Sequence, residues 1–152
     1  MTVFPTVRIA AVQATPVILD AEASIAKAVV LLGDVAEAGA RLAVLPETFV
    51  SLYPSNAWAA VAAGMDGSNG LDELWERMWA SSVDVPGPFV DELVAACRRH
   101  DLVCAIGVNE REPERPGTLY NALLLLGPDG LLWKHRKLMP TNHERRFHGI
   151  GS

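Results

Sequence analysis

Two stretches of the sequence carry side chains suited to acid–base chemistry. Glu47 follows the apolar run "RLAVLP", and the stretch "KHRKLMPTNHER" (134–145) holds six basic side chains or imidazoles beside one carboxylate, Glu144. A carboxylate can accept a proton from a nucleophile, while a lysine such as Lys137, held between carboxylates, stays protonated and stabilises negative charge that develops on a substrate. By residue type alone, a carboxylate in water and a solvated basic loop are the alternatives.

Histidines and cysteines suggest two further kinds of site, and their contexts argue against both. His135, His143 and His148 are eight and five residues apart, which matches no standard zinc pattern, and no cysteine is nearby. Cys97 is expected on the apolar face of a helix and Cys104 inside a buried strand, where an apolar setting raises a thiol pKa. We therefore expect no metal, no cofactor, and two cysteines that act as small hydrophobic residues.

Composition and charge narrow the class of protein. The 152 residues, of which 50% are apolar and 20% charged, suit one globular domain over 1–152. A net charge of −5 leaves no basic surplus for binding nucleic acid. No apolar stretch approaches the roughly 18 residues of a membrane span, no signal peptide is recognisable, and two cysteines are too few for a disulfide scaffold. These features predict a cytoplasmic protein without a membrane partner.

The elements that must position the candidate residues begin with a strand–helix–strand pattern. The run "VRIAAVQ" (7–13) predicts a buried strand, Asp20 can cap a helix that ends near Gly39, and a second strand covers 42–45. Short connections between these elements predict parallel strands. Glu47 then lies just beyond the carboxyl end of a central parallel strand, where α/β sheets bind ligands.

The rest of the chain adds helices and antiparallel strands. Helices are predicted over 71–79 and 89–100, a strand over 102–110, and a hairpin over 118–137 with Gly-Pro-Asp-Gly as its turn. The strand is a continuous apolar run, typical of a strand covered on both faces. The irregular segment 48–70 suggests a functional loop. This order predicts an α/β fold with helices on at least one face of the sheet.

Five segments, in family order from residue 7 to about 149, resemble the nitrilase superfamily of carbon–nitrogen hydrolases: "RIAAVQATPVILD", "LAVLPETFVSLYP", "SSVDVPGP", "LYNALLLLGPDG" and "KHRKLMPTNHERRFHG". The pair "LPETF" and "HRKLMPT" is the most specific signature. "VDVPGP" and "MPTNHER" favour the nitrilase branch over the amidases and carbamoylases. The resemblance implies an αββα sandwich, of which this chain supplies roughly the first half, the N-terminal portion of a carbon–nitrogen hydrolase domain.

The resemblance also implies roles for individual residues. By motif match, Glu47 is the general base, Lys137 the catalytic lysine and Glu144 the second glutamate, while Tyr53, close to Glu47, lines the substrate pocket. The implied reaction converts a small-molecule nitrile to a carboxylic acid and ammonia through a cysteine thioimidate and an acyl-enzyme. The implied assembly is a homo-oligomer.

The sequence also departs from the family pattern. The family's nucleophile stands in a "C-W-E-N"-like elbow some tens of residues beyond the lysine loop, and neither cysteine of this chain has that context. The ending "FHGIGS" replaces the family's tryptophan-and-glycine pattern. Three interpretations follow: a portion of a nitrilase that is silent alone because the nucleophile is missing, an amidase or carbamoylase (acting on an amide) with the same site residues, or a non-catalytic assembly module that associates through an uncovered sheet face.

Overall fold

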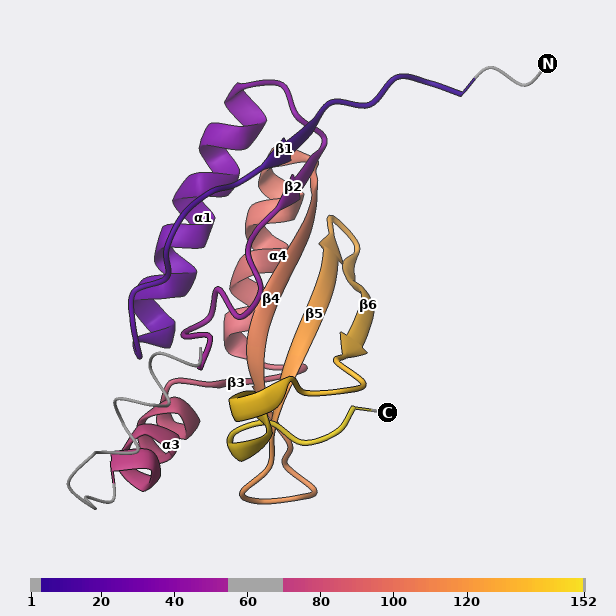
Figure 1. Ribbon diagram of the computed structural model, residues 1–152. Helices are drawn as coiled ribbons and strands as arrows, with labels where there is room; N and C mark the ends of the chain where they lie inside the picture. The colour runs from indigo at the N-terminus through magenta and orange to yellow at the C-terminus, as the bar shows by residue number, and fades with distance from the viewer. Residues whose placement is uncertain (1–3, 55–69, 152) are drawn as a thin grey trace.

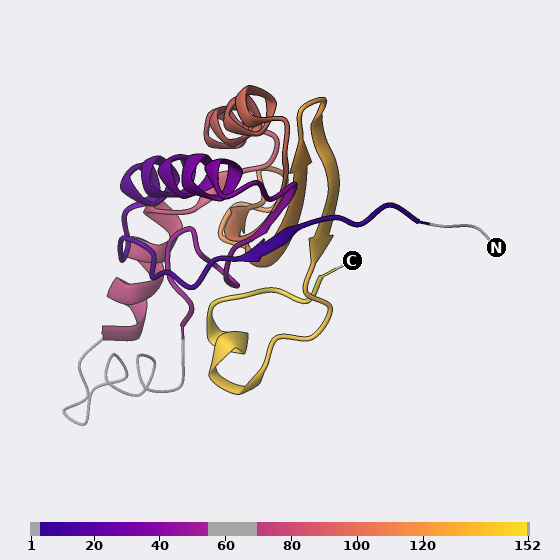
Figure 2. The ribbon, with the colours of Figure 1, turned by 90° about the horizontal axis from the view of Figure 1, so that it is seen from above.

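The computed structural model describes residues 4–54 and 70–151, which form a sheet with helices on one face. The sheet has six strands: five follow the order β1-β2-β4-β5-β6, and the short β3 pairs with β4 (Figure 1). Helices α1 and α4 pack against each other on the same face of the sheet (Figure 2). The predicted α/β class, with helices on at least one face, is confirmed.

The N-terminal part of the chain forms the predicted parallel βαβ unit. Strands β1 (Ile9–Ala11) and β2 (Leu42–Val44) pair in parallel, and helix α1 (Ala21–Glu37) connects them. Asp20 caps this helix, since its carboxylate accepts a 2.9 Å hydrogen bond from the backbone N–H of Ala23. Such a cap typically stabilises a helix by about 1 kcal/mol.

The middle of the chain contributes two helices and a very short strand. Helices α3 (Gly70–Ala80) and α4 (Pro88–His100) match the ranges predicted for them, and β3 (Val83–Asp84), which the sequence pattern does not predict, lies between them. Proline suits the start of α4, because a helix needs no N–H donor in its first turn. Within the described ranges, no helix is long and apolar enough to cross a membrane.

The C-terminal part of the chain is an antiparallel meander followed by a short helix. Strand β4 (Val103–Arg111) pairs with β5 (Leu119–Gly127), which pairs with β6 (Gly130–Arg136) through the predicted Gly-Pro-Asp-Gly turn. The 3₁₀ helix η1 (Asn142–Arg146) follows. A parallel bridge between Leu119 and His148 then holds the segment after η1 beside the start of β5.

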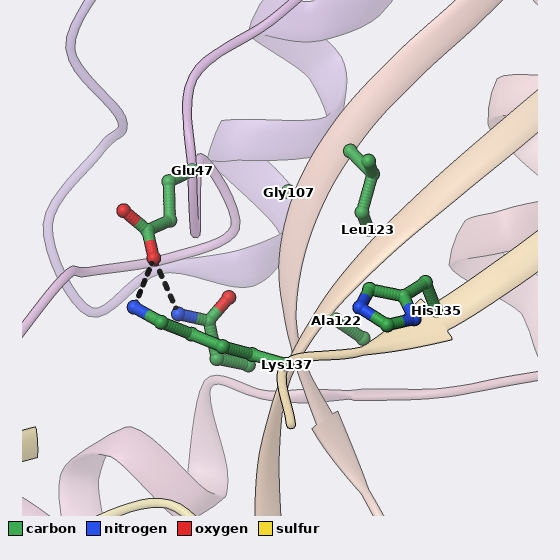
Figure 3. Close-up of a pocket in the computed structure, with 7 residues that line it drawn as sticks. Glu47, Gly107, Ala122, Leu123, His135 and Lys137 are labelled. Atoms are coloured by element: carbon green, nitrogen blue, oxygen red, sulfur yellow. Dashed lines mark hydrogen bonds and ion pairs between the residues drawn. The ribbon is translucent and has the colours of Figure 1, made fainter. Parts of the chain in front are cut away.

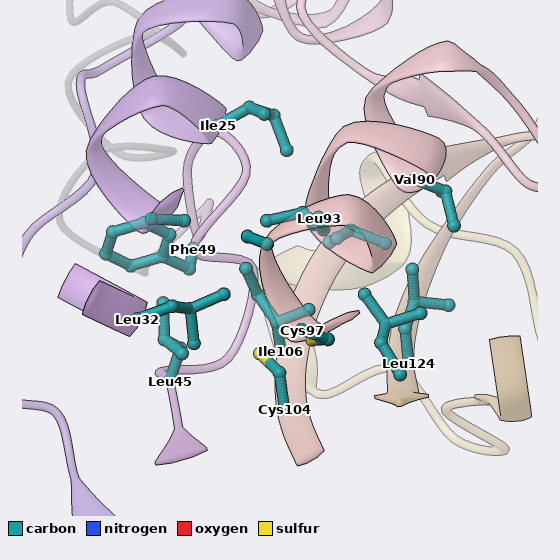
Figure 4. Close-up of a cluster of buried hydrophobic side chains, with 14 of the residues drawn as sticks. Ile25, Leu32, Leu45, Phe49, Val90, Leu93, Cys97, Cys104, Ile106 and Leu124 are labelled. Atoms are coloured by element: carbon teal, nitrogen blue, oxygen red, sulfur yellow. The ribbon is translucent and has the colours of Figure 1, made fainter. Parts of the chain in front are cut away.

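The main hydrophobic core lies between the two helices α1 and α4 and the sheet (Figure 4). Each large aliphatic side chain buried there contributes roughly 1.5–3 kcal/mol. Along β4 the side chains alternate between the two faces of the sheet, so every second one points to the helices. The fully buried members include Ile25, Leu32, Leu93, Cys97, Cys104, Ile106 and Leu124.

Helices α1 and α4 leave the opposite face of the sheet uncovered, and the short η1 lies at one end of that face (Figure 2). Cross-strand register places the side chains of Val44, Ala105, Leu125 and Trp133 in one row on this face. Its exposed apolar side chains include Ile9 (59% exposed), Val44 (40%), Leu123 (40%) and Trp133 (53%). We call this surface, which carries Ile9, Val44, Ala105, Leu123, Leu125 and Trp133, the open face.

Two expectations of buried strands are corrected by this arrangement. The strand predicted over 7–13 is only Ile9–Ala11. Ile9 is exposed because β1 lies at the edge of the sheet and the Ile9 side chain points to the open face. Strand β4 is not covered on both faces, since Val103 and Ala105 remain half-buried. Most of the loop predicted over 48–70 falls on residues 55–69, which lie outside the described residues.

Candidate active site

Glu47 lies in the segment after β2, which continues to form backbone hydrogen bonds with β4. The N–H of Leu45 donates to the Ala105 carbonyl (2.8 Å), and the N–H of Val50 donates to the Gly107 carbonyl (3.2 Å). Gly107 lies against the backbone of Glu47, because a Cβ added at Gly107 would be 2.7 Å from the Glu47 Cα. The missing side chain allows this close approach, which puts Glu47 at the end of the open face.

Lys137 reaches the same point from the end of β6. Its backbone N–H donates to the carbonyl of Asn121 on β5 (2.8 Å), which extends the strand pairing by one residue. Its Nζ lies 2.9 Å from Oε1 of Glu47 and 2.9 Å from Oε2 of Glu144 (Figure 3 shows the Glu47 contact). The side chains of Glu47, Lys137 and Glu144 thus converge at one point.

Glu144 is held in place by a capping box at the start of η1. It forms a capping box with Thr141, whose backbone N–H donates to Oε2 of Glu144 (2.8 Å). The residue is 1% exposed, so its carboxylate depends on protein donors in place of water. The capping box therefore fixes the carboxylate that holds one side of the lysine ammonium.

Asn121 is a site residue that the sequence interpretation missed. Its Nδ2 donates to Oε1 of Glu47 (2.7 Å) and to Oε1 of Glu144 (2.7 Å), and thus bridges the two carboxylates. The signal was present in the sequence, because Asn121 is the one amide in the otherwise apolar and aromatic strand "LYNALLLLG". A buried polar side chain in such a strand needs partners, which here are the two candidate catalytic carboxylates.

The charges of Lys137 and Glu144 stabilise one another. Burial alone would raise the pKa of Glu144, but hydrogen bonds from His148, Asn121, the Thr141 N–H and Lys137 outweigh burial and hold this pKa far below its ordinary value. Burial alone would lower the pKa of Lys137, and its bonds to Glu47 and Glu144 raise it instead. At neutral pH the site therefore holds an anionic Glu144 and a cationic Lys137.

A hollow of about 250 Å³ opens beside these groups (Figure 3). The Glu47 side chain is 50% exposed, and among the described residues only its Oε1 has hydrogen-bond partners. A half-exposed carboxylate thus lies beside an accessible space, with an ammonium within hydrogen-bond distance. The hollow is lined by Glu47, Gly107, Asn121, Ala122, Leu123, His135 and Lys137.

Tyr53 lies at the edge of the same cluster. Its hydroxyl donates a long hydrogen bond to Oε2 of Glu144 (3.5 Å), and the Nζ of Lys137 lies 5.7 Å from the centre of its ring. Burial, followed by the charge of Glu144, raises the pKa of Tyr53, so the phenol stays protonated. Tyr53 and Glu47 line a second hollow, of about 300 Å³.

The three histidines do not come together. The ring of His135 stacks on Trp133 at 5.4 Å on the open face, and His143 lies half-buried on η1. His148 is buried and contacts Glu144, a contact that the sequence interpretation did not predict. In residues 4–54 and 70–151, no group of three or more His, Cys, Asp or Glu side chains is arranged to hold a metal ion.

Comparison with known proteins identifies the family. Residues 8–151 match the family model described as carbon-nitrogen hydrolase. The chain belongs to the carbon–nitrogen hydrolase family. The match covers nearly the whole chain and confirms the resemblance drawn from "LPETF" and "HRKLMPT".

Several curated relatives of this family member are described as nitrilases. A bifunctional nitrilase/nitrile hydratase of Nicotiana tabacum is 40% identical over 148 residues, which are 97% of this chain and 41% of the relative. An aliphatic nitrilase of Sinorhizobium fredii is 42% identical over 144 residues, which are 95% of this chain and 46% of the relative. The chain thus spans less than half the length of these relatives.

Solved structures of carbon–nitrogen hydrolases share the fold. A superfamily protein of Xanthomonas campestris, with an arsenic adduct in its active site, aligns with a TM-score of 0.69 at 24% identity over 96% of this chain and 46% of that one. An amidase of Nesterenkonia in complex with acrylamide aligns at 0.65 and 18% identity, over 99% and 52%. The predicted fold class, with this chain as roughly one half of the family's sandwich, is confirmed.

The two cysteines of this family member lie away from the carboxylate–lysine cluster. Cys97 and Cys104 are both 0% exposed and belong to the core on the helix side of the sheet. The neighbouring Cys97 thiol, together with burial, raises the pKa of Cys104, as expected for a cysteine in an apolar core.

Proposed function

We propose that this chain supplies the carboxylate and lysine half of a nitrilase active site. In this proposal Glu47 is the general base, Lys137 the cation that stabilises and protonates the substrate nitrogen, and Glu144 the anion that holds Lys137. The observation that carries the proposal is the position of the Lys137 ammonium, 2.9 Å from each of the two carboxylates and beside an open hollow. The nitrilase relatives support the choice of a nitrile as substrate.

The proposed reaction has two stages, the formation of a thioimidate, in which Glu47 and Lys137 act, and its hydrolysis by two waters. The Glu47 carboxylate takes the proton of a cysteine thiol, and the thiolate attacks the nitrile carbon to form a thioimidate. Lys137 donates a hydrogen bond and then a proton to the nitrogen on which negative charge develops. One water adds to the carbon and ammonia leaves, then a second water hydrolyses the thioester to release the carboxylic acid and the thiol.

The thiol in this mechanism does not come from either cysteine described above. Side chains alternate along β4, and Cys104 points to the helices, whereas Gly107 and the Glu47 carboxylate lie at the open face. A nucleophile must therefore approach from the side of the open face. We propose that a polypeptide segment packed on the open face carries it, and that the 152-residue chain alone is catalytically silent.

The test joins this chain in frame to the second half of the aliphatic nitrilase from Sinorhizobium fredii, and measures ammonia and carboxylic acid released from a panel of nitriles and amides. Nitrile turnover is expected, with losses of about 10²–10⁴-fold in Glu47→Gln and Lys137→Ala. Glu22→Gln, in the first turn of α1, is the matched control and retains activity. Turnover of amides alone would instead identify an amidase or carbamoylase.

The open face supports a second, non-catalytic proposal for the isolated chain. Exposed apolar patches of this kind mark association sites in soluble proteins. We propose that the chain forms homo-oligomers through the open face when no other segment covers it. A mass of 16.4 kDa for the isolated chain in solution would contradict this proposal.

Two further features bear on the substrate and the compartment. The hollow beside Glu47 has a volume that suits a small molecule. Both cysteines are free, which fits a reducing compartment, and we propose the cytoplasm.

A further inference from the structure

His148 makes two hydrogen bonds inside the cluster and has no contact with solvent. Its side chain is 0% exposed. Its Nδ1 lies 3.3 Å from Oε1 of Glu144, and its Nε2 lies 2.8 Å from Oδ1 of Asn109 on β4. The charge state of the imidazole follows from whether each of these two partners donates or accepts a hydrogen bond.

The Asn109 partner is an acceptor, because its amide orientation is fixed from the other end. The Nδ2 of Asn109 donates a 2.9 Å hydrogen bond to the backbone carbonyl of Leu52. If the two amide atoms of Asn109 were exchanged, its oxygen would face the Leu52 carbonyl oxygen, and no proton would be available for a hydrogen bond between these two acceptors. Oδ1 therefore faces the imidazole, and Nε2 of His148 must donate.

The Glu144 partner is also an acceptor. Its carboxylate receives protons from the Lys137 ammonium, the Asn121 amide and the Thr141 N–H, and these donors keep it ionised. An ionised carboxylate can only accept hydrogen bonds, so Nδ1 of His148 must donate as well.

We propose that His148 is a buried imidazolium that positions Glu144. Only a doubly protonated imidazole donates from both ring nitrogens, whereas either neutral tautomer would leave one nitrogen lone pair against an oxygen. The proposal also balances the cluster, because the charges of Glu47 and Glu144 then equal those of Lys137 and His148. A neutral ring would leave a net negative charge in a partly buried site, which is costly.

The imidazolium has a consequence for the reaction, and this consequence rests on the proposed function. His148 donates to Oε1 of Glu144, whereas Lys137 donates to Oε2. Two cations therefore flank one carboxylate, and the positive charge of the imidazolium repels that of the Lys137 ammonium. Lys137 thus releases its proton to the substrate nitrogen more readily than it would beside a carboxylate with no second cation. His148 acts through Glu144 and Lys137 without touching the substrate.

The charged and titratable groups around the ring are few. On η1, Glu144 faces Nδ1, and from β4 the neutral amide of Asn109 faces Nε2. From β5, the contact is the backbone bridge at Leu119. Lys137 and Tyr53 contact the other oxygen, Oε2, of the same Glu144 carboxylate.

The sequence signal for a special role of His148 is the stretch "FHGIGS", which departs from the family's pattern at this position.

The charge state is tested on the unmodified chain by nitrogen NMR of ¹⁵N-labelled histidine at neutral pH. We expect the Nδ1 and Nε2 chemical shifts of His148 both to be those of protonated nitrogens, with His143 as the half-buried comparison. Sequential assignment of the wild-type spectrum identifies the signals, so no variant has to fold. One unprotonated ring nitrogen at His148 would overturn the proposal.

The positioning role is tested in the active fusion with the Sinorhizobium fredii half. We expect His148→Gln to lower kcat by about tenfold or more, less than the about 10²–10⁴-fold loss of a proton-transfer group. KM stays unchanged, and the pH profile of kcat shifts because Lys137 has lost its companion cation. His143→Gln is the matched control. An unchanged pH profile would refute the positioning role, and an imidazolium in a fusion that hydrolyses no nitrile would refute only the proposed function.

Discussion

Replacing Asn121 by leucine tests whether the two carboxylates are held together by this one amide. The substitution keeps the size of the side chain and removes both 2.7 Å hydrogen bonds. A hydrogen bond to a charged group contributes about 1.5–3 kcal/mol. The bond to the buried Glu144 should count in full, while water can replace much of the bond to the half-exposed Glu47. We therefore expect the free energy of unfolding to fall by roughly 2–4 kcal/mol.

Urea unfolding followed by tryptophan fluorescence measures this change, provided that the dependence on denaturant is the same in both proteins. A loss of this size corresponds to a decrease in Tm of roughly 4–16 °C for a domain of this length. Gln13→Leu, which removes an exposed amide, is the matched control and should stay within about 0.5 kcal/mol of the wild type. A similarly small change in Asn121→Leu would refute the bridging role.

Three further predictions test the positions of the site groups. Gly107→Ala places a Cβ against the backbone of Glu47 and should cost roughly 1–3 kcal/mol of stability, whereas Gly33→Ala, which meets only ordinary contacts in α1, should be neutral or stabilising. Both cysteines should react slowly with a soluble thiol reagent in the folded chain and rapidly in denaturant; fast reaction of the folded protein would contradict their burial. The pKa of Glu144 is lowered by folding, so its contribution to stability is present above pH 4.5, the ordinary value, and is lost as the pH falls below it. Acid unfolding of Glu144→Gln should therefore depend less steeply on pH than that of the wild type, while Glu22→Gln retains the wild-type slope.

Much of the fold could be predicted because its signals are local. The Asp20 cap and the Gly-Pro-Asp-Gly turn define a helix start and a hairpin within a few residues. Strand β3 escaped prediction because two residues have no pattern of their own, and its pairing with β4 joins positions 27 residues apart. An uncovered sheet face was expected from the resemblance to half a sandwich, but the residues of the open face were not predicted. β5 is apolar on both faces, and a strand pattern says that a face is apolar without saying which polypeptide covers it.

The site was predictable where a residue stands at the end of a strand or in a specific motif. Glu47 and Lys137 meet both conditions, and Lys137 Nζ contacts Glu47 as expected from them. Asn121 and His148 meet neither condition, since their roles depend on side-chain contacts with partners 74 and 39 residues away. Their signals are chemical: one amide in an apolar strand, and one imidazole in a segment that departs from the family pattern.

The open face and the candidate site are parts of one surface, so covering the face and completing the site should be one event. Leu123 lines the hollow beside Glu47 and is also 40% exposed on the open face. A segment packed over Leu123 excludes water from the hollow, and the attraction between Lys137 and the two carboxylates becomes stronger in that drier setting. Leu123→Lys in the fusion protein should therefore abolish packing of the two halves and nitrile turnover together, as measured by limited proteolysis and ammonia release. Val30→Lys, at an exposed position of α1, should change neither. If Leu123→Lys lost the packing and retained the turnover, the nucleophile would have to reach Glu47 by a route other than the open face.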